Sequence, residues 1–156
     1  NNGYKKITYI TGQLDNYVAK DRKQAFLDIT KDLDIADNSK TIEGIFTDGI
    51  LSYEITKNIM NSSDRPDAIM YSDDTAAIGG LKYLIEHNFS IPEDVAICGY
   101  DGVDISQLVT PRITTVQQDI HQLGYLVTNL LIDKIEGKNP KKEHWVDVKL
   151  LPGQTT

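Results

Sequence analysis

The chain has 156 residues, of which 40% are hydrophobic and 25% charged, a composition typical of one domain with a single buried core. No apolar run approaches the ~20 residues that a membrane span needs, and no signal peptide is visible ahead of the first apolar run. The net charge of −7 repels phosphates, so we expect the chain not to bind nucleic acid by itself. It begins with Asn rather than Met, as expected of a piece of a longer protein.

Cys98 is the single cysteine and lies in the apolar run of residues 95–98. One thiol excludes a disulfide within the chain and favours a reducing compartment, so we expect a cytoplasmic protein. In such a run the thiol is expected to act as a small buried hydrophobe rather than as a reactive group.

Short apolar runs alternate along the chain with amphipathic stretches of helical spacing, which predicts a parallel α/β sheet. Asp73 or Asp74 is expected to cap one helix, and Gly137 to end the longest one. The predicted strands are 7–11, 41–44, 67–71, 95–99, 110–116 and 145–151, and the predicted helices are 18–33, 51–60, 77–85 and 120–135. The expected architecture is a Rossmann-like, three-layer αβα fold with a mainly parallel sheet.

Polar and aromatic side chains gather where these strands end. In an open parallel sheet, ligands bind at the carboxyl ends of the strands, because the loops and helix N-termini there converge on one crevice. Here those ends are residues 11–15, 44–46, 71–74 and 99–102. They supply carboxylate acceptors and aromatic faces, and an Arg or amide donor lies nearby. A sugar is bound by groups of these three kinds, so the sequence predicts a site for a neutral polyol.

Each candidate side chain also has a purely structural interpretation. Asp73 and Asp101 are equally suited to capping helices or turns. Arg22 lies on the inward stripe of its helix, where the stem of an Arg is more often packed and its head solvated. Phe46 is of a type that more often packs within a loop. The residues alone leave both interpretations open.

Sequence motifs for catalysis are absent from the chain. It has no Gly-x-Gly-x-x-Gly after a strand, no Gly-x-x-x-x-Gly-Lys-Ser/Thr loop and no Gly-x-Ser-x-Gly elbow. Its histidines, His87, His121 and His144, are scattered without metal-ligand spacing. Asp73 and Asp101 could pair as in a glycosidase, which leaves a carbohydrate-active enzyme as a distant alternative. We therefore expect no enzymatic activity, no cofactor and no metal.

Three ordered sequence blocks resemble those of LacI/GalR transcriptional regulators. Residues 66–79 are similar to the family's PDAI…(N/S/T)D-x-x-A-x-G block. Residues 91–101 are similar to its (I/V)PEDV-x-(I/V)-x-G(F/Y)D block, and residues 110–124 to its TPPLTTV-x-Q…LG block. Residues 4–12 are similar to the segment that enters the family's C-terminal subdomain, so the resemblance covers essentially the whole chain.

The resemblance implies a longer regulator. Its N-terminal helix-turn-helix would bind operator DNA, and its core of two periplasmic-binding-protein-like subdomains would hold a sugar or sugar phosphate between them. Residues 1–112 would form the C-terminal effector-binding subdomain. Residues 113–140 would be the crossover segment and helix of the absent N-terminal subdomain, and residues 141–156 the returning strand. Operator DNA would be bound only through the absent helix-turn-helix, and two copies would form a homodimer.

The resemblance also implies ligand-binding positions. Ser72 is shorter than the Asn that many members carry at its position, and Gly102 replaces a common Asp, so the identity of the sugar is left open. The implied positions are Arg22 (the sugar-binding arginine), Phe46 (an aromatic that stacks on the ligand), Ser72 (the Asn position), Asp73 (the aspartate beside it), Asp101 (the ligand-binding aspartate) and Gln118 (a glutamine at the subdomain crossover).

We therefore expect the effector-binding domain of a sugar-responsive repressor, which controls DNA binding allosterically. A periplasmic sugar receptor shares this fold pattern and is the alternative. The predicted helix 120–135 carries an apolar stripe whose family partner, the N-terminal subdomain, is absent. We expect this stripe to find a surrogate surface, most simply another copy of the chain. Its members are Ile120, Leu123, Val127, Leu130 and Leu131.

Overall fold

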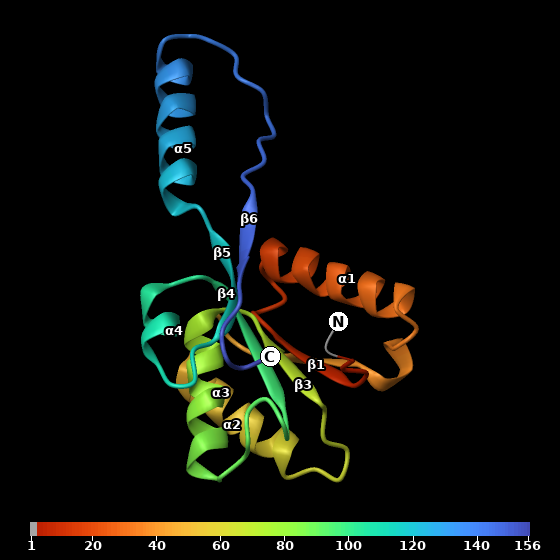
Figure 1. The fold of residues 1–156 in the computed structure, drawn as a ribbon. Helices are drawn as coiled ribbons and strands as arrows, with labels where there is room; N and C mark the ends of the chain where they lie inside the picture. The colour runs from red at the N-terminus through yellow and green to blue at the C-terminus, as the bar shows by residue number, and fades with distance from the viewer. Residues whose placement is uncertain (1–2) are drawn as a thin grey trace.

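The computed structural model describes residues 3–156 and contains one six-stranded sheet in the order β2-β1-β3-β4-β5-β6 (Figure 1). β1 to β5 are parallel, and β6 pairs antiparallel with β5. The strands are β1 (Ile7–Thr11), β2 (Lys40–Glu43), β3 (Ala68–Tyr71), β4 (Ala96–Asp101), β5 (Thr114–Gln118) and β6 (Val148–Leu151). The helices are α1 (Tyr17–Asp32), the 3₁₀ helix η1 (Ala36–Asn38), α2 (Gly49–Met60), α3 (Asp74–Glu86), α4 (Asp104–Leu108) and α5 (Ile120–Ile135).

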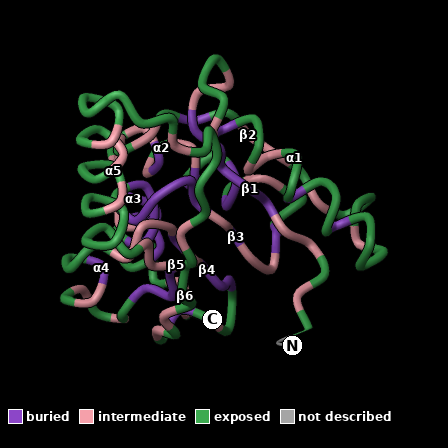
Figure 2. Tube along the Cα trace, turned by 90° about the horizontal axis from the view of Figure 1, so that it is seen from above, coloured by how far each residue is buried: buried purple, intermediate pink, exposed green. Residues whose placement is uncertain are grey.

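Helices cover both faces of the sheet (Figure 1, Figure 2). On one face Phe26 of α1 packs on Tyr9 of β1, with the ring centroids 5.4 Å apart. On the other face α2 and α3 pack together, and the hydroxyl of Tyr71 on β3 lies 2.8 Å from that of Thr56 on α2. The predicted three-layer αβα fold with a mainly parallel sheet is confirmed.

Two adjacent glycines of α3 allow the layer of α2 and α3 to pack tightly. A Cβ at Gly79 would lie 1.9 Å from the carbonyl oxygen of Gly49, and a Cβ at Gly80 would lie 1.9 Å from the hydroxyl of Tyr71. Any side chain at these positions would push α3 away from α2 or from the sheet. The glycine pair lowers the helix propensity of this segment, and close packing explains why it is there.

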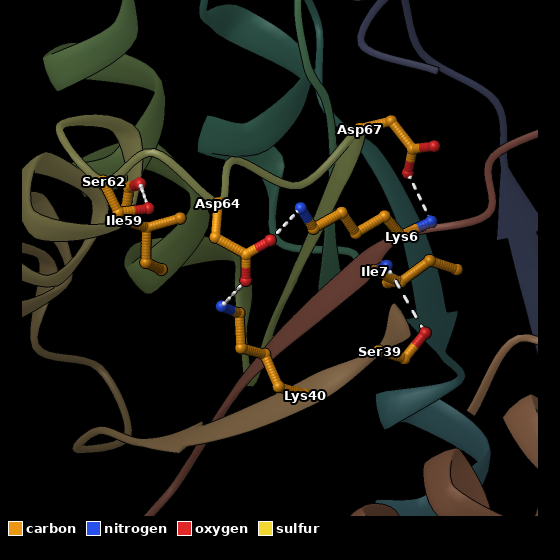
Figure 3. A network of polar contacts seen from close by, with 8 residues as sticks. All are labelled: Lys6, Ile7, Ser39, Lys40, Ile59, Ser62, Asp64 and Asp67. Atoms are coloured by element: carbon orange, nitrogen blue, oxygen red, sulfur yellow. Dashed lines mark hydrogen bonds and ion pairs between the residues drawn. The ribbon is translucent and has the colours of Figure 1, made fainter. Parts of the chain in front are cut away.

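The amino-terminal edge of the sheet carries a network of polar contacts (Figure 3). The carboxylate of Asp67 accepts hydrogen bonds from the backbone N–H groups of Lys5 and Lys6, each at 2.9 Å. Asp64 pairs with Lys40 at 2.7 Å and also with Lys6, and the hydrogen bonds from these two lysines lower the pKa of Asp64 to about 2. Ion pairs as exposed as these stabilise a fold only weakly. Their position aligns the start of β1 with its neighbours, so this edge has a structural role.

Differences from the predicted elements are confined to short or terminal segments. η1 and α4 were not predicted, because neither is long enough to display a helical period. The last strand is shorter than the predicted 145–151: its pairing begins where Gln118 meets Val148, so residues 145–147 lie beyond the end of β5. The strand expected at 110–116 begins instead at Thr114, which is the first residue to pair with β4.

α5 stands away from the rest of the molecule, joined to the sheet by β5 and β6 (Figure 1). The side chain of Asp119 caps it by accepting a hydrogen bond from the N–H of Gln122 at 2.8 Å. None of its 16 residues is buried, and Val127 and Leu131 are 56% and 59% exposed. Within residues 3–156 no surrogate surface covers the apolar stripe, so another polypeptide is expected to cover it. No helix in this part of the chain is long and apolar enough to cross a membrane.

Candidate functional site

The loops that follow β2 and β4 have an unusual backbone at the carboxyl edge of the sheet. Thr47 and Asp101 have φ angles of 58° and 105°, in the left-handed region that non-glycine residues rarely adopt. Gly102 follows with a φ of 71°, and a Cβ there would lie 2.5 Å from the Cβ of Gln117. Conformations of this kind cluster at functional sites, where the surrounding structure enforces them. Asp34 and Asn88 share this conformation where the chain leaves α1 and α3, so it is not confined to this edge.

Arg22 reaches from α1 across this edge. Its Cζ lies 3.7 Å from the centroid of the Tyr100 ring and 5.9 Å from that of the Phe46 ring. Its Nη1 donates a hydrogen bond to the carbonyl oxygen of Ser72 at 3.0 Å. Within residues 3–156 the guanidinium has no second protein acceptor, so most of its five N–H donors are free for a ligand. The structure thus brings together three of the predicted site residues.

Phe46 is held in place by the loop that follows β1. A Cβ at Gly12 would lie 2.2 Å from the Phe46 ring, so the ring rests directly on the backbone of Gly12. The backbone N–H of Phe46 donates to Oε1 of Gln13 at 3.3 Å. The ring is half-buried. Its position is therefore fixed by the loop after β1 as well as by its own loop.

Ser72 and Asp73 are both buried, with their side chains turned into the protein. Oδ1 of Asp73 accepts from the N–H of Ala76 at 2.9 Å, which caps α3 as predicted. Oδ2 accepts from the N–H of Thr47 at 2.9 Å and from the hydroxyl of Ser72 at 3.0 Å. Because these three contacts occupy both oxygens of the Asp73 carboxylate, this side chain has a structural role. Ser72 offers its carbonyl oxygen to Arg22, while its hydroxyl is taken by Asp73.

Asp101 and Gln118 form a second pair at the same edge. Nε2 of Gln118 donates to Oδ1 of Asp101 at 2.6 Å, and both residues are half-buried. Within the described chain Oδ2 of Asp101 has no hydrogen-bond partner. Arg22 stacks on Tyr100, which directly precedes Asp101 on β4. The pair of Asp101 and Gln118 therefore lies at the end of the same strand. Asp101 is thus the predicted aspartate that keeps an acceptor free.

Asp74 braces the ends of the strands from within the protein. Its Oδ1 accepts from the hydroxyl of Thr115 at 2.6 Å, and its Oδ2 accepts from the N–H of Val103 at 2.8 Å. Burial raises the pKa of the Asp74 carboxyl, and these hydrogen bonds oppose that rise. The side chain connects α3 to β5 and to the loop after β4, so it fixes the turn that presents Asp101.

Tyr100 is the site residue that sequence reasoning did not assign. The sequence shows an aromatic residue at the end of a strand, but stacking on Arg22 depends on where α1 crosses β4.

Burial raises the pKa of the Cys98 thiol to about 11, so this thiol stays protonated at neutral pH. Residues 3–156 contain no group of three or more His, Cys, Asp or Glu side chains that could hold a metal ion. The site instead offers donors, one free carboxylate oxygen and aromatic faces.

This fold and edge define a binding-protein-like domain, and the sequence profile of the periplasmic binding protein-like domain matches residues 1–156. The chain therefore belongs to that family. The HTH-type transcriptional repressor PurR of Mannheimia succiniciproducens is 32% identical over 145 residues, 91% of this chain and 42% of that repressor. The ribose operon repressor of Haemophilus influenzae is 30% identical over 145 residues, with the same two shares. The chain thus spans less than half the length of these relatives.

Solved structures agree with this assignment. An uncharacterized protein from Actinobacillus succinogenes is 33% identical and superposes with a TM-score of 0.90 over 98% of this chain and 56% of its own. The Lac repressor dimer bound to operator and the anti-inducer ONPF has a TM-score of 0.91 over 99% of this chain and 53% of its own. At 23% identity, that second likeness shows the fold. Together with the repressors above, these matches confirm the predicted resemblance to the C-terminal part of a LacI/GalR regulatory core.

The two aspartates of the edge are expected to differ in their effect on stability. Asp73→Asn removes charge-assisted hydrogen bonds from a buried carboxylate and should lower the free energy of unfolding by about 1.5–3 kcal/mol. Asp101→Asn keeps the oxygen that Gln118 contacts and tolerates a positive φ, so its effect should stay within about 0.5 kcal/mol. Urea denaturation of the two variants measures the difference. Equal losses would contradict the division into a structural and a free carboxylate.

Proposed function

We propose that this chain is the C-terminal half of the effector-binding core of a transcriptional repressor, and that its carboxyl edge forms one wall of a sugar site. The observation that carries the proposal is the position of Arg22, stacked on Tyr100 beside Phe46 with most of its donors unused. A guanidinium held over an aromatic ring is prepared for oriented hydrogen bonding. The relatives that are repressors support the regulatory part of the proposal.

The chemistry of the edge favours a neutral polyol over a sugar phosphate. Arg22 supplies donors, Oδ2 of Asp101 supplies an acceptor, and the rings of Phe46 and Tyr100 supply flat apolar faces. Hydroxyl groups of a sugar both donate and accept, so they fit an edge that offers both a donor and an acceptor. A phosphate would meet one arginine at an edge that also carries the free carboxylate oxygen of Asp101, which opposes its binding.

The remaining wall would come from the rest of a longer protein. The relatives are more than twice as long as the part of them that this chain matches. The exposed stripe of α5 supports a docking role for that helix in the missing subdomain. In this arrangement the sugar would bind two subdomains at once and shift the equilibrium between their relative positions, which changes the affinity of the DNA-binding part. The chain itself, with its net charge of −7, would not contact operator DNA.

A periplasmic sugar receptor is the competing proposal, because such receptors share this family of domains. The names of the relatives favour a cytoplasmic repressor. The parent reading frame upstream of Asn1 separates the two proposals: a helix-turn-helix supports the repressor, and a signal peptide supports the receptor. An enzyme is a more distant alternative, and turnover of a sugar by the purified protein would establish it.

Removal of the free donors or of the free acceptor should abolish tight sugar binding by the full-length protein. Arg22→Met and Asp101→Asn are each expected to weaken binding at least tenfold, about 1.4 kcal/mol, because the first removes the free donors and the second replaces the free charged acceptor with a neutral donor. Calorimetry with D-ribose, D-galactose, D-glucose and their phosphates measures the change.

Lys20→Met is the matched control, since Lys20 is an exposed cation on the same helix as Arg22. It should leave binding unchanged. If the wild type binds none of these compounds, or binds only the phosphates, the neutral-sugar proposal is wrong. If Arg22→Met binds like the wild type, the assignment of the site is wrong.

We also infer that two copies associate through the outer faces of α2 and α3. A groove of about 520 Å³ lies there, lined by Tyr53 and Ile78 among others, and Ile50 at its rim is 84% exposed. An exposed apolar patch of this kind favours a protein interface.

Ile50→Asp should convert a dimer of the full-length protein to a monomer in light scattering, whereas Leu123→Asp on α5 should not. Dissociation by Leu123→Asp alone would instead place the contact on α5.

A further inference from the structure

The turn that presents Asp101 has a backbone conformation that needs support from its surroundings. Asp101 has a φ of 105°, and Gly102 follows with a φ of 71°. A non-glycine residue keeps such a φ only where the contacts around it enforce the conformation. Asp101 also carries the free acceptor of the candidate site. The contacts that enforce this turn therefore decide where that acceptor lies.

Two buried side chains that are not among the ligand-binding candidates hold the backbone of this turn. The N–H of Val103 donates to Oδ2 of Asp74 at 2.8 Å. The N–H of Gly102 donates to the hydroxyl of Thr115 at 3.3 Å. The same hydroxyl donates to Oδ1 of Asp74 at 2.6 Å. Asp74 and Thr115 are almost fully buried, so these hydrogen bonds are protected from water. The turn is thus tied to one carboxylate by two routes.

The neighbouring strand leaves room for this carboxylate. A Cβ at Gly99 on β4 would lie 2.3 Å from Oδ1 of Asp74, so a side chain there would displace the carboxylate. Asp74 is the first residue of α3, where an exposed acidic side chain would be enough to favour the N-terminus of the helix. Its burial, and its contacts to β5 and to the loop after β4, indicate a role beyond the stability of α3.

The two adjacent carboxylates at the start of α3 support different parts of the edge. Asp73 holds the loop after β2 and the end of β3. Asp74 holds the turn after β4 and, through Thr115, the strand β5. That strand ends at Gln118, which donates to Asp101. The backbone turn and the side-chain partner of Asp101 therefore both lie on segments that Asp74 contacts.

We propose that Asp74 is a positioning residue of the candidate site, which sets the place of the Asp101 carboxylate through Thr115 and the turn at residues 102–103. This inference rests on the proposed function. Asp74 itself does not touch the ligand. Without its contacts the turn can relax from the positive φ, and the Asp101 carboxylate then leaves the position in which it meets the sugar. A binding group that is misplaced by about 1 Å contributes much less.

The test uses the full-length protein and compares two variants of Thr115 with Asp74→Asn. Calorimetry measures affinity for whichever of D-ribose, D-galactose and D-glucose the wild type binds best. Thr115→Val removes the hydroxyl and should weaken binding at least about fivefold. Thr115→Ser keeps the hydroxyl and should bind within about twofold of the wild type. Asp74→Asn replaces one accepting oxygen by a donor, so it should weaken binding to a similar extent as Thr115→Val.

Thr56→Val is the matched control for loss of stability. Thr56 is also a fully buried threonine with a paired hydroxyl, but it lies on α2 against Tyr71. In thermal unfolding this variant should lower the melting temperature as Thr115→Val does, because each breaks buried hydrogen bonds. It should leave the affinity for sugar unchanged. Equal losses of affinity in the two variants would mean general destabilisation and would overturn the inference.

A double-mutant cycle measures whether the effect passes through Asp101. In Asp101→Asn the free charged acceptor is already gone, so adding Thr115→Val should weaken binding by less than about twofold more. Losses of affinity that simply add would overturn the inference. If Thr115→Val alone binds like the wild type, the inference is wrong and the proposed function stands. If the wild type binds none of the sugars, the proposed function fails and this inference fails with it.

Discussion

The part of the carboxyl edge that holds Arg22 and Phe46 depends on one buried carboxylate, Asp73. Asp73 begins α3 by capping it, and the same group holds the N–H of Thr47 and the hydroxyl of Ser72. Through these contacts the loop after β2 and the end of β3 are fixed relative to each other. That geometry fixes the carbonyl oxygen of Ser72, which accepts a hydrogen bond from Arg22. It also fixes Phe46, which directly precedes Thr47. A site that is preorganised in this way loses less entropy when a ligand binds.

The two ends of the sheet have different chemistry, although both carry many charges. At the amino-terminal edge, Lys6 and Lys40 are paired with Asp64, so their charges are matched within the chain (Figure 3). At the carboxyl edge, Arg22 and Asp101 keep polar atoms free. In a parallel sheet, the helix N-termini and the loops meet at the carboxyl edge. The arrangement of strands thus decides which charged residues serve the fold and which remain available.

How much of the structure could be predicted from the sequence depends on how far apart in the chain the interacting residues lie. β1 and α5 were placed closely, because an apolar run and a helical stripe are local patterns. The parallel topology directed the prediction of a site to the carboxyl edge, where the structure brings Arg22, Phe46 and Ser72 together. The inward orientation of Ser72, the stacking of Tyr100 and the bracing by Asp74 were not predicted, since each requires a partner that is distant in sequence.

We propose that this chain supplies one wall of a ligand site and that the second wall comes from the part represented by the other half of its relatives. The direct test is calorimetric titration of the 156-residue chain beside the full-length protein, with the same sugar and buffer. We expect micromolar binding by the full-length protein and binding at least about 100-fold weaker by the isolated chain, because enclosure supplies most of the affinity of such sites. Micromolar binding by the isolated chain would contradict it.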